Sequence, residues 1–276
     1  MGADDSVDYS KKGDPNMGFS DGKKGEESGH SVGVWKGAST AETRWQITTP
    51  ARLILAGPSQ AGKSTLLVKL ATDDSVWKNP FKSVFYVSPG RESRESRDKY
   101  ISAFHEKCKK VGKTFISLDK LPARQDLMDF SGGRHIFLII DDALGFQNLE
   151  TIDTYYTEHS HHDNISVALC VQNLYPRTRK LDMVTMVRNA SGVFLFYQVS
   201  DLRMYNIFAQ GPFPGKSKFF NDCLKKAKMR YGLRYVFVNF HPDSGIDPSY
   251  MCYTAIFAEE RGQFGGSPLF FDANKT

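Results

Sequence analysis

The stretch GPSQAGKST, at residues 57–65, combines two glycines, a lysine and three hydroxyl residues at a spacing that supports specific chemistry. It matches G-x-x-x-x-G-K-[S/T] at every defined position, the pattern of loops that cradle the phosphates of a nucleotide. The apolar run RLILA precedes it, and the helix-favouring run KSTLLVKL starts inside it. Such a loop requires this setting, because the amides at the start of the helix must point at the phosphates. A glycine-rich turn with an exposed lysine, the alternative interpretation, requires neither the spacing nor the setting.

Each residue type in this stretch has a physical task. Glycine at positions 57 and 62 permits backbone angles and close approaches that a Cβ would block. Lys63 is placed to reach the β- and γ-phosphates as a cation, and the Ser64 hydroxyl to coordinate Mg²⁺. The sequence therefore predicts a site for ATP and Mg²⁺. The residues expected to contact the nucleotide are Gly57, Pro58, Ser59, Gln60, Ala61, Gly62, Lys63, Ser64 and Thr65.

Two acidic residues follow the apolar run HIFLII at residues 135–140. Asp141 is expected to hold the magnesium ion through water, as the acid at the end of a buried strand does in P-loop enzymes. Asp142 is expected to polarise the attacking water, although its side chain is shorter than the glutamate often found at this place. Alternatively, Asp142 caps the helix that follows, which aspartate does well. One residue can do both.

A polar pair, Gln172-Asn173, comes directly after the apolar run ISVALCV. Ligands of open α/β sheets bind at the carboxyl ends of the strands, so Gln172 is expected to sense the γ-phosphate. A solvated strand end is the alternative for this pair. Three histidines, His159, His161 and His162, precede the same run. No matching Cys/His pair follows them, so we interpret them as a solvated loop rather than a metal site.

The elements that must position these residues follow from the pattern of apolar runs. Most runs are continuously apolar instead of alternating, which indicates strands buried on both faces of a parallel sheet. Segments of helical length lie between them, and this alternation predicts a helix-flanked, mostly parallel sheet. Together with the phosphate loop, it predicts an α/β P-loop NTPase fold of the RecA/ASCE type. The expected strands are 52–56, 83–87, 135–140, 165–171, 193–197 and 235–240, and the expected helices are 63–71, 93–111, 147–159, 200–209 and 219–231.

The chain divides into one folded domain and two flanking segments. Residues 1–45 are rich in Gly, Ser, Lys and Asp and lack aliphatic periodicity, so we expect a disordered N-terminal arm. Residues 46–260 form the expected P-loop ATPase domain, in which the run YTAIFA at 253–258 is a candidate edge strand. The Gly-rich end, residues 261–276, is expected to be a flexible C-terminal tail.

Composition narrows the class of protein. The chain has 276 residues, 40% hydrophobic and 24% charged, which suits a globular protein with a sizeable core. No apolar run reaches the roughly 18–20 residues of a spanning helix, so no membrane partner is expected. The start, MGADDS, formally fits the myristoylation pattern, but that pattern is loose and acids follow the glycine at once. Four cysteines without zinc-site or disulfide spacing indicate reduced thiols of an intracellular protein: Cys108, Cys170, Cys223 and Cys252.

Several of these segments resemble a known family. GPSQAGKST, the strand end FYVSP, LIIDDAL and, above all, HHDNISVALCVQNLYPRTRK with VRNASGVFLFYQVSD resemble the viral genome-packaging ATPases of the FtsK–HerA superfamily. The similarity is greatest to the ATPases of Polinton-like and adenovirus- or virophage-related elements, and poxvirus-type relatives are more distant. It runs from about Leu53 to Phe213, and its specific part is the segment from His161 to Asp201.

The resemblance implies an oligomeric ring motor that couples ATP hydrolysis to driving double-stranded DNA into a capsid. The implied partners are double-stranded DNA, further copies of this chain and a capsid or portal protein. The implied place is inside the host cell, in the cytoplasm or nucleus, or on the virion. Arg188 is the candidate for an arginine finger, although Polinton-type sequences keep their arginine a few residues before the asparagine. Arg177, Arg179 and Arg203 compete for this role, or contact DNA phosphate, or pair with surface acids.

Two lysine-rich stretches are candidates for DNA contact, because a motor needs backbone contacts without base readout and the net charge is +5. A solvated surface is the alternative. Two other function classes stay open. One is a nucleotide or nucleoside kinase, against which Gln172 and the Asp141-Asp142 pair count, and the other is an ATP-dependent assembly protein without DNA translocation. The stretches comprise Lys216, Lys218, Lys225, Lys226, Lys228, Arg230 and Arg234, and Lys107, Lys109, Lys110 and Lys113.

Overall fold

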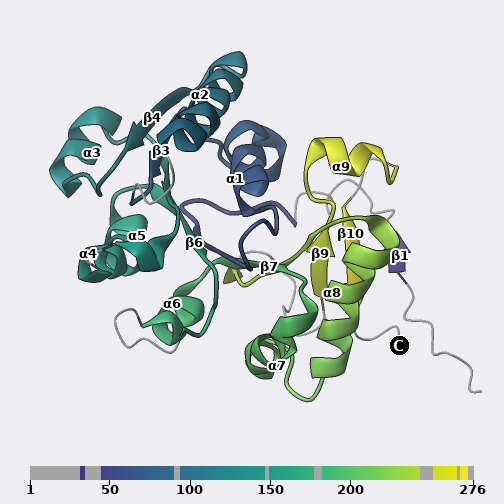
Figure 1. The fold of residues 1–276 in the computed structure, drawn as a ribbon. Helices are drawn as coiled ribbons and strands as arrows, with labels where there is room; N and C mark the ends of the chain where they lie inside the picture. Colours follow the sequence, from purple (N-terminus) through teal and green to yellow (C-terminus); the bar gives the residue numbers. More distant parts are fainter. Residues whose placement is uncertain are drawn as a thin grey trace, which may run out of the picture.

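The computed structural model describes residues 32–34, 45–89, 94–146, 149–176, 182–242, 251–265 and 268–272. Within these residues the chain forms one twisted sheet with helices on both faces (Figure 1). The described strands follow the order β1-β10-β9-β8-β7-β2-β6-β5-β3-β4. No described helix has both the length and the apolar character that crossing a membrane requires.

One part of the sheet is parallel throughout. Every neighbouring pair from β4 to β7 is parallel, and β2 lies between β6 and β7. The carboxyl ends of these strands therefore meet at one edge of the sheet, where α/β proteins bind ligands. The strands are β2 (Arg52–Ala56), β3 (Ser83–Val87), β4 (Thr114–Leu118), β5 (Ile136–Ile140), β6 (Ile165–Val171) and β7 (Gly192–Phe196).

The other part of the sheet is antiparallel. Each of its strands pairs antiparallel with its neighbour, starting with β8 on β7. As a result β8 begins at the edge where the parallel strands end. The strands are β8 (Tyr235–Asn239), β9 (Met251–Thr254), β10 (Leu269–Asp272) and β1 (Val32–Val34).

The helices connect the parallel strands and flank the antiparallel ones. A π-helical turn, Tyr155–His159, joins α4 to α5. Short 3₁₀ turns lie at Asp74–Val76, Ala143–Gly145 and Val199–Asp201. The helices are α1 (Lys63–Thr72), α2 (Arg94–Lys110), α3 (Arg124–Ser131), α4 (Leu149–Thr154), α5 (Ser160–His162), α6 (Met183–Asn189), α7 (Leu202–Gln210), α8 (Ser217–Tyr231) and α9 (Ala258–Gly262).

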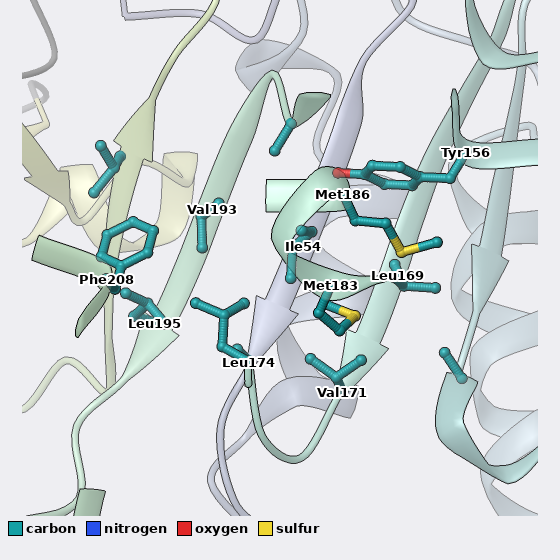
Figure 2. Packing of buried hydrophobic residues seen from close by; sticks show 14 of the residues in the cluster. Ile54, Tyr156, Leu169, Val171, Leu174, Met183, Met186, Val193, Leu195 and Phe208 are labelled. Carbon is teal, nitrogen blue, oxygen red and sulfur yellow. The ribbon is translucent and has the colours of Figure 1, made fainter. Parts of the chain in front are cut away.

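Two hydrophobic cores lie on opposite faces of the sheet. Along β2, Ile54 belongs to one core, whereas Leu53 and Leu55 belong to the other. Helices α1 and α2 cover the second face, and α3, α4, α6, α7 and α8 cover the first. Figure 2 shows the first core, where Met183 and Met186 of α6 lie over Ile54 and its neighbours. Both faces of the inner parallel strands are buried, which is why their sequences are continuously apolar.

The structure confirms the mostly parallel α/β sheet and corrects the predicted ends of the domain. Val32–Val34 lies in the predicted disordered arm but forms β1, while most of that arm lies outside the described residues. The predicted flexible tail contributes β10, on which Leu269 and Phe271 are buried. The candidate edge strand is also wrong, because β9 lies between β8 and β10. The glycines before the short run LFF favoured a flexible tail in the sequence, whereas the strand forms by pairing with β9 and β1.

Candidate nucleotide-binding site

The loop Gly57–Gly62 leaves the end of β2, in the middle of the sheet, and leads into α1. Its two motif glycines are required for different reasons. At Gly62 φ is 107°, in the left-handed region that a side chain strains. A Cβ on Gly57 would lie 2.7 Å from the Cβ of Phe196 on β7. The loop start is therefore packed directly on the neighbouring strand.

Lys63 is the first residue of α1 and is folded back over the loop. Its ammonium donates to the carbonyl oxygens of Gly57 at 2.5 Å and Pro58 at 2.7 Å. Burial lowers the pKa of Lys63, while nearby Cys170 and the two acids, Asp141 and Asp142, act in the opposite direction. The lysine thus connects the loop start, the helix start and the acidic pair.

Asp141 lies directly after β5 and is held by two donors. Its Oδ2 accepts from the Tyr86 hydroxyl at 2.7 Å, and its Oδ1 accepts from the Asp142 amide at 2.9 Å. Tyr86 lies on β3, the strand that pairs with β5. Burial, and next the charge of Asp141, raise the pKa of the Tyr86 hydroxyl, so Tyr86 acts as a neutral donor. Asp141 keeps a fixed orientation toward the cleft.

Asp142 adopts the left-handed conformation, with φ 46° and ψ 51°. It occupies the N-cap position of the turn Ala143–Gly145, but its side chain makes no cap hydrogen bond. The cap alternative is therefore not supported. Left-handed aspartate is uncommon and its strain is typical of functional sites, where the surrounding structure holds it.

A cleft of 630 Å³ gathers the residues from these separate elements. Gln172, exposed just after β6, lies at the same cleft because β6 is parallel to both β2 and β5. Gln172 thus lies at the cleft and its role stays a prediction, whereas Asn173 does not line the cleft and accepts from the Tyr175 amide at 2.9 Å. Of the predicted nucleotide contacts, Gly57, Pro58 and Ala61 do not line this cleft. The predicted residues that line it are Ser59, Gln60, Gly62, Lys63, Ser64, Thr65, Asp141, Asp142 and Gln172.

The donor set of the cleft fits a magnesium ion. Magnesium prefers oxygen ligands and keeps several waters, and Ser64 and Asp141 supply a hydroxyl and a carboxylate. The histidines lie elsewhere and on helical turns, not in the predicted loop. The ring of His159 is 5.2 Å from that of Tyr155, and its Nδ1 is 3.8 Å from Asp163.

The arginine-finger candidates are not gathered at the cleft of their own chain. Arg188 is exposed on α6, and Arg203 is exposed on α7. Neither lines the 630 Å³ cleft. Arg177 and Arg179 lie outside the described residues. The structure leaves the identity of a finger as a prediction.

The lysine-rich stretch at residues 107–113 contains both exposed and buried lysines. Lys113 is wrong as a DNA-contacting candidate, because it is buried beneath α1 and donates to the Ala71 carbonyl at 2.8 Å. Its ammonium also pairs with Asp74 at 2.5 Å and lies over the ring of Phe81. Burial lowers the pKa of Lys113. The other lysines of that stretch, Lys107, Lys109 and Lys110, are exposed.

Arg234 is a site residue that the sequence did not indicate as such. It precedes β8, lines the 630 Å³ cleft, and its Cδ lies 3.5 Å from the position of a Cβ on Gly62. It makes no hydrogen bond or ion pair within the part of the chain that the structure describes. The antiparallel direction of β8 brings it to the loop. The composition of a strand does not indicate whether it pairs parallel or antiparallel with its neighbour. The sequence therefore identified Arg234 only as part of a lysine-rich stretch, not as a residue of the nucleotide site.

No protein-family model and no curated protein matches the chain. Among solved structures it is similar to the genome packaging NTPase of Sulfolobus turreted icosahedral virus 2 in complex with ATP-gammaS. That similarity has 14% identity over 69% of this chain and 92% of the other, with a TM-score of 0.39. It is similar to the flagellar accessory protein FlaH of Methanocaldococcus jannaschii, with 16% identity, coverage of 54% and 71%, and a TM-score of 0.36. A KaiC-like protein of Pyrococcus horikoshii has 15% identity, coverage of 53% and 72%, and the same TM-score of 0.36.

At these TM-scores none of the three structures assigns a function. The fold is established by the chain itself. A G-x-x-x-x-G-K-S loop joins a central parallel strand to a helix, and an acid follows a neighbouring parallel strand. This arrangement is that of an α/β P-loop NTPase.

Proposed function

We propose that this protein binds ATP with Mg²⁺, hydrolyses it, and uses the reaction to move double-stranded DNA into a viral capsid. The observation that carries hydrolysis is the convergence of Lys63, Asp141 and Gln172 on one cleft from the ends of β2, β5 and β6. These side chains supply a cation for the phosphates, a magnesium ligand and a contact for the γ-phosphate.

Each of these residues has a task in the proposed attack of water on the γ-phosphate. Lys63 exchanges at least one of its two carbonyl bonds for phosphate oxygens when the nucleotide binds. Ser64 and Asp141 hold the magnesium ion, which when bound neutralises charge on the phosphates. Asp142, next to Asp141 but without a capping bond, accepts the proton of the attacking water. The presence of Gln172 and the Asp141-Asp142 pair at the cleft favours hydrolysis over kinase chemistry.

The motor function rests on the sequence resemblance, strongest in the segment from His161 to Asp201. The exposed lysines of α8, Lys218, Lys225 and Lys228, suit contact with DNA phosphates. Copies of the chain form a ring in which Arg188 reaches the nucleotide of the next copy. A capsid or portal protein receives the ring inside the host cell.

The test is the steady-state ATPase rate of the purified protein with and without double-stranded DNA, over a salt series. We expect DNA to raise the rate and salt to remove the increase, because counterions compete for the phosphates. Lys63→Ala should abolish turnover in both conditions. Lys113→Ala is not a suitable surface control, since Lys113 is buried, whereas Lys120→Ala is, because Lys120 is exposed and lies outside both lysine-rich stretches.

Each outcome separates the alternatives. Turnover of Lys63→Ala at the wild-type rate would overturn the site. A Lys63-dependent rate that DNA does not change would overturn DNA translocation by the chain alone and favour an ATP-dependent assembly protein. Transfer of phosphate to a nucleotide acceptor rather than to water would identify a kinase.

A further inference from the structure

A second cleft adjoins the phosphate cleft on the side of β7 and β8. It measures 460 Å³ and shares Gly62, Thr65 and Arg234 with the phosphate cleft, so the two lie next to each other. Its walls come from α1, from the turn between α8 and β8, and from α9. The phosphate cleft instead extends toward the ends of β5 and β6.

The two ends of the phosphate cleft differ, and this difference sets the direction in which a bound nucleotide lies. Its γ-phosphate end lies where Asp141 and Gln172 meet Ser64. Amides at the start of the helix cradle the inner phosphates, so the chain of phosphates passes Thr65 as it leaves the loop. Beyond Thr65, on the side away from Asp141, lies the second cleft.

The second cleft has the chemistry that a nucleoside requires. Leu66 and Tyr231 supply apolar and aromatic surface for a flat base. Gln263 offers an amide donor and acceptor. Glu259, whose Oε2 lies 3.5 Å from the Lys69 ammonium and whose side chain is 77% exposed, offers a carboxylate for ribose hydroxyls. Resting on the proposed function, we propose that this cleft binds the base and ribose of the nucleoside triphosphate.

The wall formed by α9 is anchored rather than loose. The carboxylate of Glu260 accepts from Lys69 of α1 at 2.8 Å and from the Tyr235 hydroxyl at 2.5 Å. The Glu260 side chain is only 9% exposed. A helix near the C-terminal end of the chain is thereby fixed against the helix that follows the phosphate loop, which gives the nucleoside a preformed site.

A third cleft, of 330 Å³, lies on the outer side of the loop and provides the matched comparison. It contains Pro58, Gln198 and Lys228 but not Thr65. A nucleoside there would have to leave the loop from its start rather than from the helix. Gln198→Trp and Gln263→Trp therefore place the same side chain in the two competing clefts.

The experiment measures the dissociation constants of ATP and of inorganic tripolyphosphate by calorimetry with Mg²⁺. Tripolyphosphate has the phosphates but no nucleoside. We expect Gln263→Trp to weaken ATP binding by about tenfold or more and to leave tripolyphosphate within about twofold of wild type. Glu259→Trp, on the same exposed wall, should do the same and serves if the first variant fails to fold. Gln198→Trp should leave both constants unchanged.

The failures are distinguishable. If Lys63→Ala weakens both ligands while the Trp variants of Gln263 and Glu259 bind ATP as wild type does, the nucleoside site is wrong and the phosphate site stands. A loss of ATP binding in Gln198→Trp alone would move the nucleoside to the third cleft and overturn the proposal. If wild type binds neither ligand, the proposed function fails and this inference with it.

Discussion

The close packing of the phosphate loop on β7 makes Gly57→Ala a sharp perturbation. The added Cβ would lie 2.7 Å from the Cβ of Phe196 and 3.2 Å from its Cγ. Carbon atoms in contact lie about 3.5–4.0 Å apart, so one backbone segment must move by about 1 Å. Truncating the Phe196 ring would not relieve this contact, because the nearest atom is its Cβ.

The size of the effect follows from this overlap. Overpacking of this kind costs about 1–3 kcal/mol, and the smaller entropy of unfolded alanine returns less than about 1 kcal/mol. We expect a net loss of about 1–2 kcal/mol, which lowers Tm by roughly 2–8 °C in a chain of this size. Moving Gly57 also displaces the start of the loop that cradles the phosphates, so ATP binding should weaken by about tenfold.

Gly211→Ala is the matched control. Gly211 has φ −74°, and the nearest atom to an added Cβ is the Phe208 carbonyl oxygen at 3.6 Å. It should be neutral or stabilise by up to about 1 kcal/mol. Thermal melting and ATP titration of the two variants provide the comparison. A Gly57→Ala protein that melts at or above the wild-type temperature would refute the steric reasoning.

Three further predictions concern the site and its supports. Asp142→Asn should bind ATP but not turn it over, because an amide cannot accept the proton, and surviving multiple turnover would exclude that role. Tyr86→Phe removes the bond to Asp141, so urea titration should show a loss of about 1–3 kcal/mol and activity should need more Mg²⁺; an unchanged Mg²⁺ dependence would contradict the positioning role. Burial lowers the pKa of His135 to about 4, below its unfolded value of 6.5, so the unfolded chain protonates first as pH falls. Stability should therefore drop by roughly 3 kcal/mol between pH 6.5 and 4, and His135→Asn should flatten this dependence in urea titrations at each pH.

Much of the site was predictable because its residues obey local rules. The phosphate loop is recognised from the spacing of consecutive residues, and Asp141 and Gln172 each follow a continuously apolar run. Parallel strands bring such positions to a single edge whatever the order of the strands. This is why the sequence placed these side chains together without knowledge of which strand neighbours which.

The remainder depends on tertiary pairing that local patterns do not encode. Arg234 reaches the loop only because β8 is antiparallel to β7. Lys113 looked like a solvated lysine, but the start of β4 brings it beneath the end of α1. The edge strand β4 was not predicted, because its sequence alternates only weakly. Helix α6 was not predicted either, although Asp182, which accepts from the Thr185 amide at 3.1 Å, is a residue type typical of a helix N-cap.

The central place of β2 has a consequence for the order in which the protein can acquire its site. The strand that carries the loop is synthesised before both of its neighbours in the sheet, which are residues 165–171 and 192–196. Contacts so distant in sequence form late, after the loops between them close. A chain still attached to the ribosome therefore holds an unsupported loop until β7 has emerged. ATP can stabilise the loop only after β7 has paired with β2, so nucleotide binding follows the assembly of the parallel strands rather than guiding it.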